Sequence, residues 1–297
     1  MKTIKLLLLL IFLAGCSKSG NKIPAVPDTI VDDIGVKVTI KPVPQRVITL
    51  APNLTEMIYE LGEGSKLVGN TTYCNFPPPA KLVEKVGNML TVDYEKIVSL
   101  KPDLIFMTVV GNSKNSYDKL KDLGMSVFVS NPKTFSGINK TFLDMGKIFN
   151  KEKFAKEKIS QWDSVINYTK NKSAGIQNNK VMFLVSLRPI MLAGKNTFIN
   201  EIIETAGLKN IANDTKVNYP VYSREEVLKK NPDYIILFEN KNLTANAVKS
   251  AYEEWSELNA SKQNHIIFVD PDLFARPGPR YYLAVEFLYN KIHRQHK

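Results

Sequence analysis

The sequence predicts an α/β protein built from two similar lobes that are joined by one long helix, with a ligand cleft between the lobes. Three observations predict this fold. Short apolar strands alternate with helical segments, which is typical of parallel βαβ units. The order of these elements is repeated in the second half of the chain. Between the two halves, residues 136–172 contain no proline, which permits a long helix there.

A positive net charge is compatible with nucleic acid, an anionic membrane surface or an acidic ligand as partner. The chain has 297 residues, of which 44% are hydrophobic and 23% charged, and its formal net charge is +11. This length suffices for two domains. Lysines and glutamates alternate between Lys151 and Lys158, which indicates a solvated helix face. Because no zinc-finger spacing or RNA-binding aromatic motif occurs, we expect no nucleic-acid partner.

The first residues are typical of a signal peptide and are not part of the fold. Lys2 and Lys5 flank the start of an apolar run that is too short to span a bilayer and that ends in Leu13-Ala14-Gly15-Cys16. This ending resembles the lipobox of bacterial lipoproteins, which implies removal of residues 1–15 and lipidation of Cys16. The alternative is an ordinary secretory signal with an incidental cysteine. We expect residues 16–43 to be the lipidated tether of an extracytoplasmic, membrane-anchored protein.

Residues 44–150 form the predicted N-terminal lobe. After a strand at 46–50, Asn53 and Glu56 have capping-box spacing, and Gly62 ends the helix that they begin. Three consecutive prolines from Pro77 predict a loop. The other predicted elements are strands at 66–70, 103–108 and 125–130 and helices at 93–100 and 115–124.

The predicted inter-lobe helix covers residues 151–172, and the C-terminal lobe covers residues 178–297. The segment between the lobes lacks the Gly-, Ser- and Pro-rich composition that is typical of a flexible linker. In the second lobe we predict strands at 180–186, 233–237 and 265–270, helices at 196–207, 223–230 and 245–258, and a last helix from Arg280 after the loop 271–279.

One unit of the two lobes is repeated without a gap. Asp93–Met107 matches Ser223–Leu237, so that Glu95 pairs with Glu225 at an offset of 130 residues. Each glutamate lies in the first turn of a helix, where the helix dipole stabilises a carboxylate by about 0.3–1 kcal/mol. Helix stabilisation is one interpretation. The other is that the two acids lie on one face of the molecule and orient a basic partner across both lobes.

Four segments resemble a known family: RVITLAPNLTEMIYELG, VGNTTYCNFPPPAK, YEKIVSLKPDLI and SREEVLKKNPDYII. They are similar to extracytoplasmic substrate-binding proteins of ABC importers for cobalamin, siderophores and haem, and SREEVL and DLFARPGPRYYLA are most similar to the cobalamin binders. The resemblance implies two Rossmann-like lobes with mainly parallel sheets and a ligand in the cleft between them. It also implies that Glu95 and Glu225 pair with arginines of a permease dimer.

The same resemblance implies five ligand-binding residues. Tyr73 and Phe76 lie in the proline-rich loop of the first lobe, Tyr219 precedes a proline in the second, and Asp272 and Arg276 lie before the last helix. Aromatic faces and a few polar groups suit a large flat ligand. The alternatives are that the aromatic residues belong to the core and that Asp272 and Arg276 form a local surface pair.

Two further residues bear on the identity of the ligand. Met89 lies where the cobalamin binders would have a bulky aromatic residue. Arg188 is expected near the cleft and would suit an anionic ligand such as a carboxylate siderophore. The resemblance to the cobalamin binders makes a corrinoid the first hypothesis, a ferric siderophore the second, and haem the third.

We expect a binding protein, not an enzyme. The sequence contains no P-loop, no G-x-S-x-G, no HExxH and no Cys-His cluster with metal-ligand spacing. Cys74, the only cysteine besides Cys16, is expected to be a small packed residue, so no disulfide, metal site or resident cofactor is expected. A monomeric carrier that docks on a permease remains the main hypothesis, and a surface adhesin the third class.

Overall fold

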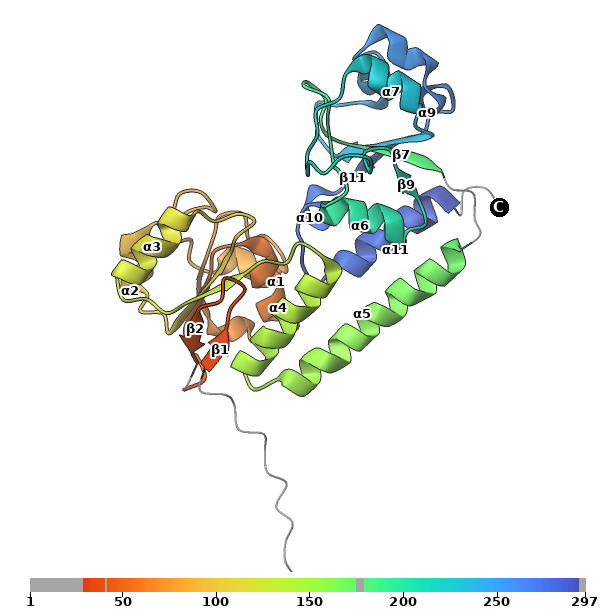
Figure 1. Cartoon of the computed structure of the whole chain (residues 1–297). Coiled ribbons are helices and arrows are strands. Elements are labelled where there is room, and N and C mark those ends of the chain that lie inside the picture. Colours follow the sequence, from red (N-terminus) through yellow and green to blue (C-terminus); the bar gives the residue numbers. More distant parts are fainter. Residues whose placement is uncertain (1–28, 41, 175–178, 294–297) are drawn as a thin grey trace, which may run out of the picture.

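The computed structural model describes residues 29–40, 42–174 and 179–293. Two α/β lobes lie next to each other, and helix α5 (Glu152–Ser173) runs from the first to the second (Figure 1). The predicted signal peptide and Cys16 lie outside the described residues. Among the helices of the described ranges, none combines the length and the apolar character needed to cross a bilayer.

The N-terminal lobe is built on a sheet of four parallel strands. Their order is β4 (Leu67–Asn70), β3 (Val47–Thr49), β5 (Leu104–Thr108) and β6 (Val127–Ser130). All residues of β3, β5 and β6 are buried, which explains why these strands are apolar runs without alternation. The connecting segments contain the helices α1 (Pro52–Glu60), α2 (Tyr94–Ser99) and α3 (Lys114–Asp122) and the 3-10 turns η1 (Gly64–Lys66) and η2 (Pro78–Leu82).

The expected tether at 16–43 needs a correction, because part of it belongs to the N-terminal lobe. Strands β1 (Thr29–Val31) and β2 (Lys37–Thr39) form an antiparallel hairpin. Asp33 donates its backbone N–H to the Val129 carbonyl at 2.9 Å. Asp32 Oδ2 accepts from Val129 N at 3.2 Å. These bonds fasten the hairpin to β6, so the lobe begins at residue 29 and not at residue 44.

The predicted inter-lobe helix at 151–172 coincides with α5 within one residue at each end. It follows helix α4 (Phe135–Ile148) after a turn in which Asn150 has a φ of 57°. Trp162 of α5 is buried against Phe142 of α4, with ring centroids 4.7 Å apart. Phe154, near the start of α5, is exposed.

The C-terminal lobe is built on a five-stranded sheet. Its order is β11 (Ile266–Val269), β10 (Tyr234–Phe238), β7 (Lys180–Ser186) and β8 (Met191–Leu192), and β9 (Lys209–Asn210) also pairs with β7. Only the β7–β8 pair is antiparallel. The helical segments are α6 (Phe198–Thr205), α7 (Arg224–Lys230), α8 (Ala245–Lys249), η3 (Glu253–Glu257), α9 (Asn259–Lys262), α10 (Pro271–Phe274) and α11 (Tyr281–His293).

One apolar core continues from one lobe into the other. At its centre, Tyr281 of α11 stacks on Phe135 of α4 with ring centroids 4.0 Å apart and contacts Phe198 of α6 at 5.4 Å. Helix α11 also packs along α5 and α6. Separating the lobes would expose these rings, so the packing restricts their relative motion.

Candidate ligand-binding cleft

Two adjoining cavities of about 280 and 290 Å³ lie between the lobes and share Val110, Ala275 and Pro277. Both are lined from both sides, with residues of the N-terminal lobe and residues of the C-terminal lobe and its last loop. The cleft lies where several strands end at their carboxyl ends, which is the usual ligand position in parallel α/β sheets. The predicted inter-lobe cleft is therefore present.

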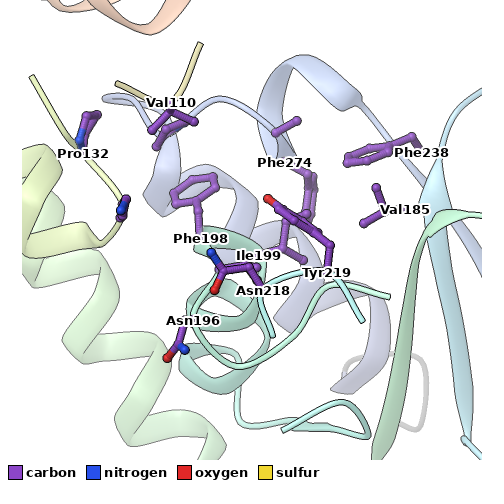
Figure 2. Close-up of a pocket in the computed structure, with 14 residues that line it drawn as sticks. Val110, Pro132, Val185, Asn196, Phe198, Ile199, Asn218, Tyr219, Phe238 and Phe274 are labelled. Atoms are coloured by element: carbon purple, nitrogen blue, oxygen red, sulfur yellow. The ribbon is translucent and has the colours of Figure 1, made fainter. Parts of the chain in front are cut away.

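The first cavity, here named the aromatic pocket, is walled by Phe198, Tyr219, Phe238 and Phe274. Figure 2 shows Phe198, Tyr219 and Phe274 pointing towards a common space, with Val110 of the other lobe above it. Local sequence explains these positions. Phe198 is the first residue of α6, whose N-cap Thr197 accepts from Asn200 N, and Phe238 and Phe274 end β10 and α10.

Neutral polar groups border the aromatic pocket. The lining side chains include the amides of Asn196 and Asn218, and Lys133 is the charged residue of this lining. Partial burial raises the pKa of the Tyr219 hydroxyl, which therefore stays protonated at neutral pH. The pocket can cover a flat apolar face and donate hydrogen bonds at its edge.

The second cavity, here named the polar pocket, is lined by Asn53, Tyr73, Met89, Asp272 and Arg276 among others. Tyr73 remains 55% exposed, so its ring is free to cover a ligand. Met89 lies over Gly111, where a Cβ would come within 1.8 Å of the Met89 methyl group. The absence of a side chain at Gly111 thus makes room for the flexible methionine.

A network of ion pairs crosses the lobe junction beneath the polar pocket. Glu56 of α1, whose side chain is 2% exposed, lies 2.8 Å from Arg280 and 3.2 Å from Arg276. Arg276 also contacts Asp272 at 2.5 Å and donates to Asn75 Oδ1 at 2.8 Å. The guanidinium of Arg276 is therefore surrounded by two carboxylates and bound to both lobes.

The predicted capping box at Asn53 and Glu56 is wrong. Helix α1 begins at Pro52, and its N-cap Ala51 makes no side-chain hydrogen bond. Asn53 donates to the carbonyl of Pro277 at 3.1 Å, and Glu56 accepts from Arg276 and Arg280. Both side chains serve contacts between the lobes, because the N-terminal end of α1 is buried at the lobe junction, where these tertiary partners lie within reach.

The structure brings five of the seven predicted ligand-binding residues to the cleft. Tyr73, Met89, Asp272 and Arg276 line the polar pocket, and Tyr219 lines the aromatic pocket. The alternative of a local Asp272–Arg276 pair is also present, because these two side chains bind each other while lining the pocket.

Two predicted residues lie elsewhere. Phe76 lines neither pocket, and its ring lies under the guanidinium of Arg280, 4.2 Å from Cζ to centroid. Arg188, expected near the cleft, is corrected: it donates to the Ala251 carbonyl at 2.7 Å and lies over the Tyr252 ring. The physical reason is that Tyr252 and a free carbonyl offer this arginine a stacking and hydrogen-bonding site outside the cleft.

Sequence reasoning missed Glu56, Phe198, Phe238 and Phe274. The signal that points to the three phenylalanines is their position directly at the end of a β-strand or at the boundary of a helix, on the side where strands of an α/β sheet end. No sequence pattern near Glu56 indicates that it binds Arg276 and Arg280, which follow it by 220 residues or more.

Glu95 and Glu225 have matching surroundings. The N-caps Asp93 and Ser223 accept from Lys96 N and Glu226 N, and Ser223 and Glu226 form a capping box. Both glutamates are exposed, and neither has an ion-pair partner within the described ranges. Their helices α2 and α7 lie on the side of each lobe away from α5 (Figure 1).

Cys74 is buried beside the polar pocket. The hydroxyls of Thr55 and Thr71 lie 3.1 and 3.2 Å from its Sγ. The predicted packed thiol is confirmed. Within the part of the chain that the structure describes, no group of three His, Cys, Asp or Glu side chains is placed to hold a metal ion.

Comparisons with known proteins agree on one family. A family model described as periplasmic binding protein matches residues 47–273. The uncharacterized ABC transporter substrate-binding lipoprotein YvrC of Bacillus subtilis is 36% identical over 303 residues, covering 97% of this chain and 95% of that protein. The vitamin B12-binding protein of Vibrio cholerae is 31% identical over 248 residues, covering 83% and 88%.

Solved structures match as well. The periplasmic vitamin B12 binding protein BtuF of Vibrio cholerae superposes with a TM-score of 0.72 at 29% identity, covering 86% of this chain and 99% of that one. A possible iron-binding protein of Staphylococcus epidermidis superposes with a TM-score of 0.75 at 29% identity, covering 84% and 99%. Identity to these two proteins is equal, so it does not distinguish their ligands.

Proposed function

Because this chain belongs to the periplasmic binding protein family and is a substrate-binding component of an ABC importer, not an enzyme, we propose that its cargo is a corrinoid, cobalamin or cobinamide. The corrinoid is bound between the lobes and delivered to the permease dimer. It is transported cargo and not a resident cofactor.

The observation that carries this proposal is the charge balance of the cleft. Three residues that line the two pockets carry a charge: Lys133, Asp272 and Arg276. Arg276 is compensated by Asp272 and Glu56, so it offers little attraction to an anionic ligand. A cleft of this kind favours a ligand of low net charge over a polyanion.

The neutral polar groups support the same ligand class. Asn53, Asn196 and Asn218 line the cleft with amide side chains, which both donate and accept hydrogen bonds. A corrin ring combines flat apolar faces with a periphery of neutral amides. Aromatic faces from Tyr219 and Phe274 and amides at the edge complement both features.

Titration of the purified protein with cyanocobalamin tests the proposal. We expect a dissociation constant in the micromolar range or tighter, and no detectable binding would refute a corrinoid as cargo. A Glu95→Lys and Glu225→Lys double variant is the matched control, because it changes the charge of the surface without touching the cleft. Its cyanocobalamin affinity should equal that of the unmodified protein.

A ferric siderophore is the second candidate, supported by the similarity to the possible iron-binding protein and by Lys133, a cation without an ion-pair partner in the described ranges. Thermal-shift measurements with corrinoids, ferric siderophores and haem separate the candidates. Haem is less well supported, because neither pocket is lined by histidine and the raised pKa of Tyr219 disfavours a phenolate ligand.

For docking, we propose that Glu95 and Glu225 each pair with arginines of one permease half. The support is their exposure and their lack of an ion-pair partner within the described ranges, on a chain whose net charge is +11. The Glu95→Lys and Glu225→Lys double variant should lose uptake while keeping ligand affinity. Reversal of Glu157 and Glu286, exposed on α5 and α11, makes the same change in charge and should leave uptake intact.

We also propose that the monomer is held at the membrane by a lipid on Cys16. A Cys16→Ser variant should then leave the membrane fraction. If the variant sediments with membranes like the unmodified protein, the anchor is wrong, whereas the ligand proposal is unaffected.

A further inference from the structure

Lys85 is a partly buried lysine without an acidic partner. It lies between η2 and the segment that leads to α2, and its backbone forms a parallel bridge with Asn70 at the end of β4. In the part of the chain that the structure describes, its ammonium makes no ion pair. Burial lowers the pKa of this ammonium. A cation that loses water without gaining a carboxylate is costly unless other polar groups surround it.

The ammonium of Lys85 joins three parts of one loop. It donates to Asn70 Oδ1 at 2.6 Å, to the Ala80 carbonyl at 2.9 Å and, more loosely, to the Cys74 carbonyl at 3.5 Å. These acceptors lie at the start, at the end and in the middle of residues 70–80, which we name the cleft loop. Asn70 Nδ2 donates to the same Ala80 carbonyl at 2.9 Å. The lysine thus uses all three of its N–H donors, and no neutral side chain offers three.

The cleft loop carries Tyr73, whose ring lines the polar pocket. Within the described residues, the side chain of Tyr73 makes no hydrogen bond and stacks on no other ring. The position of the ring therefore follows the backbone of the loop. The next residue along the chain is Cys74, whose carbonyl accepts from Lys85 and whose N–H donates to the Thr71 carbonyl at 3.0 Å.

The cleft loop is also bound to the C-terminal lobe. Asn75 Nδ2 donates to Asp272 Oδ2 at 2.6 Å, and Arg276 donates to the Tyr73 carbonyl at 3.2 Å. These contacts come from the lobe opposite to Lys85. The loop is therefore fixed from within its own lobe by the lysine and from across the cleft by the last loop of the chain. A shift of its backbone would move the aromatic ring and the contacts between the lobes together.

We propose that Lys85 is a positioning residue for cargo binding, which holds the cleft loop so that Tyr73 covers the cargo. This inference rests on the proposed function, because it requires that the cargo lie between the lobes. Lys85 itself lines neither pocket, so it acts through the loop and not by touching the cargo. A loop that is ordered before the cargo arrives loses less conformational entropy on binding.

Amide hydrogen exchange of the protein without ligand tests whether Lys85 orders the loop. Lys85→Met keeps an unbranched apolar side chain and removes the three donors. We expect peptides that span residues 72–80 to exchange about fivefold faster in this variant, because local opening is easier there. Lys81→Met is the matched control, since Lys81 is exposed in η2 and its loss changes the net charge equally. It should exchange like the unmodified protein. Unchanged exchange in Lys85→Met overturns the proposal whatever the cargo is.

A second variant and a second region guard against a general loss of folding. Lys85→Gln has two donors on a shorter side chain and cannot serve the three oxygens, so it should loosen the same loop if Lys85→Met does not fold. Peptides from the sheet of the C-terminal lobe should keep the exchange rate of the unmodified protein in both variants. Faster exchange in both lobes would assign Lys85 to the stability of the whole fold and would overturn its positioning role.

A double-mutant cycle with Tyr73 tests whether Lys85 acts through that ring. Isothermal titration with cyanocobalamin should show about fivefold weaker binding by Lys85→Met, because the apparent affinity falls with the fraction of molecules whose loop is in place. In the Tyr73→Ala background the same substitution should weaken binding by less than about twofold, because the ring that it positions is absent. Lys81→Met should bind like the unmodified protein in both backgrounds.

The cycle separates this inference from the proposed function. Equal losses of about fivefold in both backgrounds would show that Lys85 does not act through Tyr73 and would overturn the proposal. Unchanged affinity of Lys85→Met would also overturn it and would leave the corrinoid cargo standing. If the unmodified protein binds no cyanocobalamin, the corrinoid is refuted, and the exchange measurement still decides whether Lys85 holds the loop, because it uses no ligand.

Discussion

Helices α1 and α6 occupy the same place in their lobes, yet their central glutamates have different partners. Leu54–Gly62 matches Ile199–Gly207, so that Glu56 corresponds to Glu201. The glycines that end both segments have φ values of 75° and 77°. Glu56 reaches across the lobe junction to Arg276 and Arg280. Glu201 reaches across in the opposite direction, where its Oε2 accepts from the backbone N–H of Phe135 at 2.6 Å.

The difference lies in how each buried charge is compensated. Glu56 has two guanidinium groups, so its charge is neutralised where it lies. Glu201 has one backbone N–H at its carboxylate, and burial raises its pKa although that hydrogen bond opposes the shift. A duplicated scaffold has thus kept two acids at the junction, and within the described residues Glu56 forms ion pairs whereas Glu201 feels the charge of Lys170 without forming an ion pair with it. The N-terminal lobe is held to the last loop by charge, and the C-terminal lobe is held to α4 more weakly.

Glu56→Gln should have the largest effect on stability. It leaves the guanidinium groups of Arg276 and Arg280 partly buried without their shared carboxylate, and breaking a buried ion pair from one side costs about 3 kcal/mol. We expect the free energy of unfolding to fall by about this amount in urea titrations. Glu60→Gln, at the C-terminal end of the same helix, is the control, because it weakens only a half-buried ion pair with Lys158 at 2.9 Å and should cost about 1 kcal/mol or less. Equal effects of the two substitutions would show that the cross-lobe network contributes no special stability.

Tyr73→Ala and Tyr219→Ala compare the aromatic contributions of the two lobes to ligand binding. Each ring lines one pocket and is about half exposed, at 55% and 48%. Loss of either ring should weaken cyanocobalamin binding about tenfold, while substitution by Phe should retain most of it. Isothermal titration measures both. Tyr168→Ala, 57% exposed on α5, controls for the loss of a surface ring. If only one of the cleft variants binds more weakly, the ligand occupies one pocket and not both.

Local patterns predicted the repeated unit well. The caps at Asp93 and Ser223 were visible from residue type and spacing alone. In the repeated Pro-Asp pairs, Asp103 accepts from Gln45 N and Arg46 N, and Asp233 accepts from Lys180 N, so each aspartate fastens its strand to the neighbouring strand. Signals of this kind depend on residues close in sequence or on strands that the fold class already places together.

The polar contacts that join the lobes beneath the polar pocket could not be predicted in the same way. Asn53 and Glu56 fit a capping box in the sequence, and only the folded chain brings Pro277, Arg276 and Arg280 to them. The predicted position of Arg188 near the cleft was wrong for a related reason, because its guanidinium packs on the ring of Tyr252 outside the cleft. A side chain whose partner is distant in sequence has no local pattern, so the resemblance to a family located the cleft more reliably than spacing did.

Two substitutions with smaller expected effects test backbone strain at equivalent positions of the repeated unit. Lys101 and Asn231 occupy equivalent positions after α2 and α7, and both have a positive φ, 46° and 44°. Asn tolerates this conformation better than Lys. Lys101→Asn should therefore raise the free energy of unfolding by about 0.5 kcal/mol. Asn231→Lys should lower it by about 1 kcal/mol, since it also removes the bond from Asn259 N to Asn231 Oδ1. Thermal unfolding measures the change in stability of each variant. A change in stability of the same sign in both variants would contradict the argument from backbone strain.

Glu201→Gln is expected to have the smallest effect at neutral pH, and its direction should be opposite to that of Glu56→Gln. The glutamine keeps an acceptor for Phe135 N–H and removes the cost of burying a charge. We expect the free energy of unfolding at pH 7 to rise by about 0.5 kcal/mol or less.

The pH dependence separates this effect from a change in packing. Burial raises the pKa of Glu201 in the folded protein above its value in the unfolded chain, which is about 4.3. Between these two pKa values the folded state binds more protons, so the unmodified protein loses stability as the pH rises through that window, and it regains none of this stability above it. Glu201→Gln removes the slope, and its advantage over the unmodified protein should therefore grow as the pH rises from the unfolded-state pKa to the raised folded-state pKa and then stay constant. Glu157→Gln, exposed on α5, should show no such trend. An advantage that is the same at every pH would mean that the glutamine packs better and that the buried charge of Glu201 does not weaken the junction.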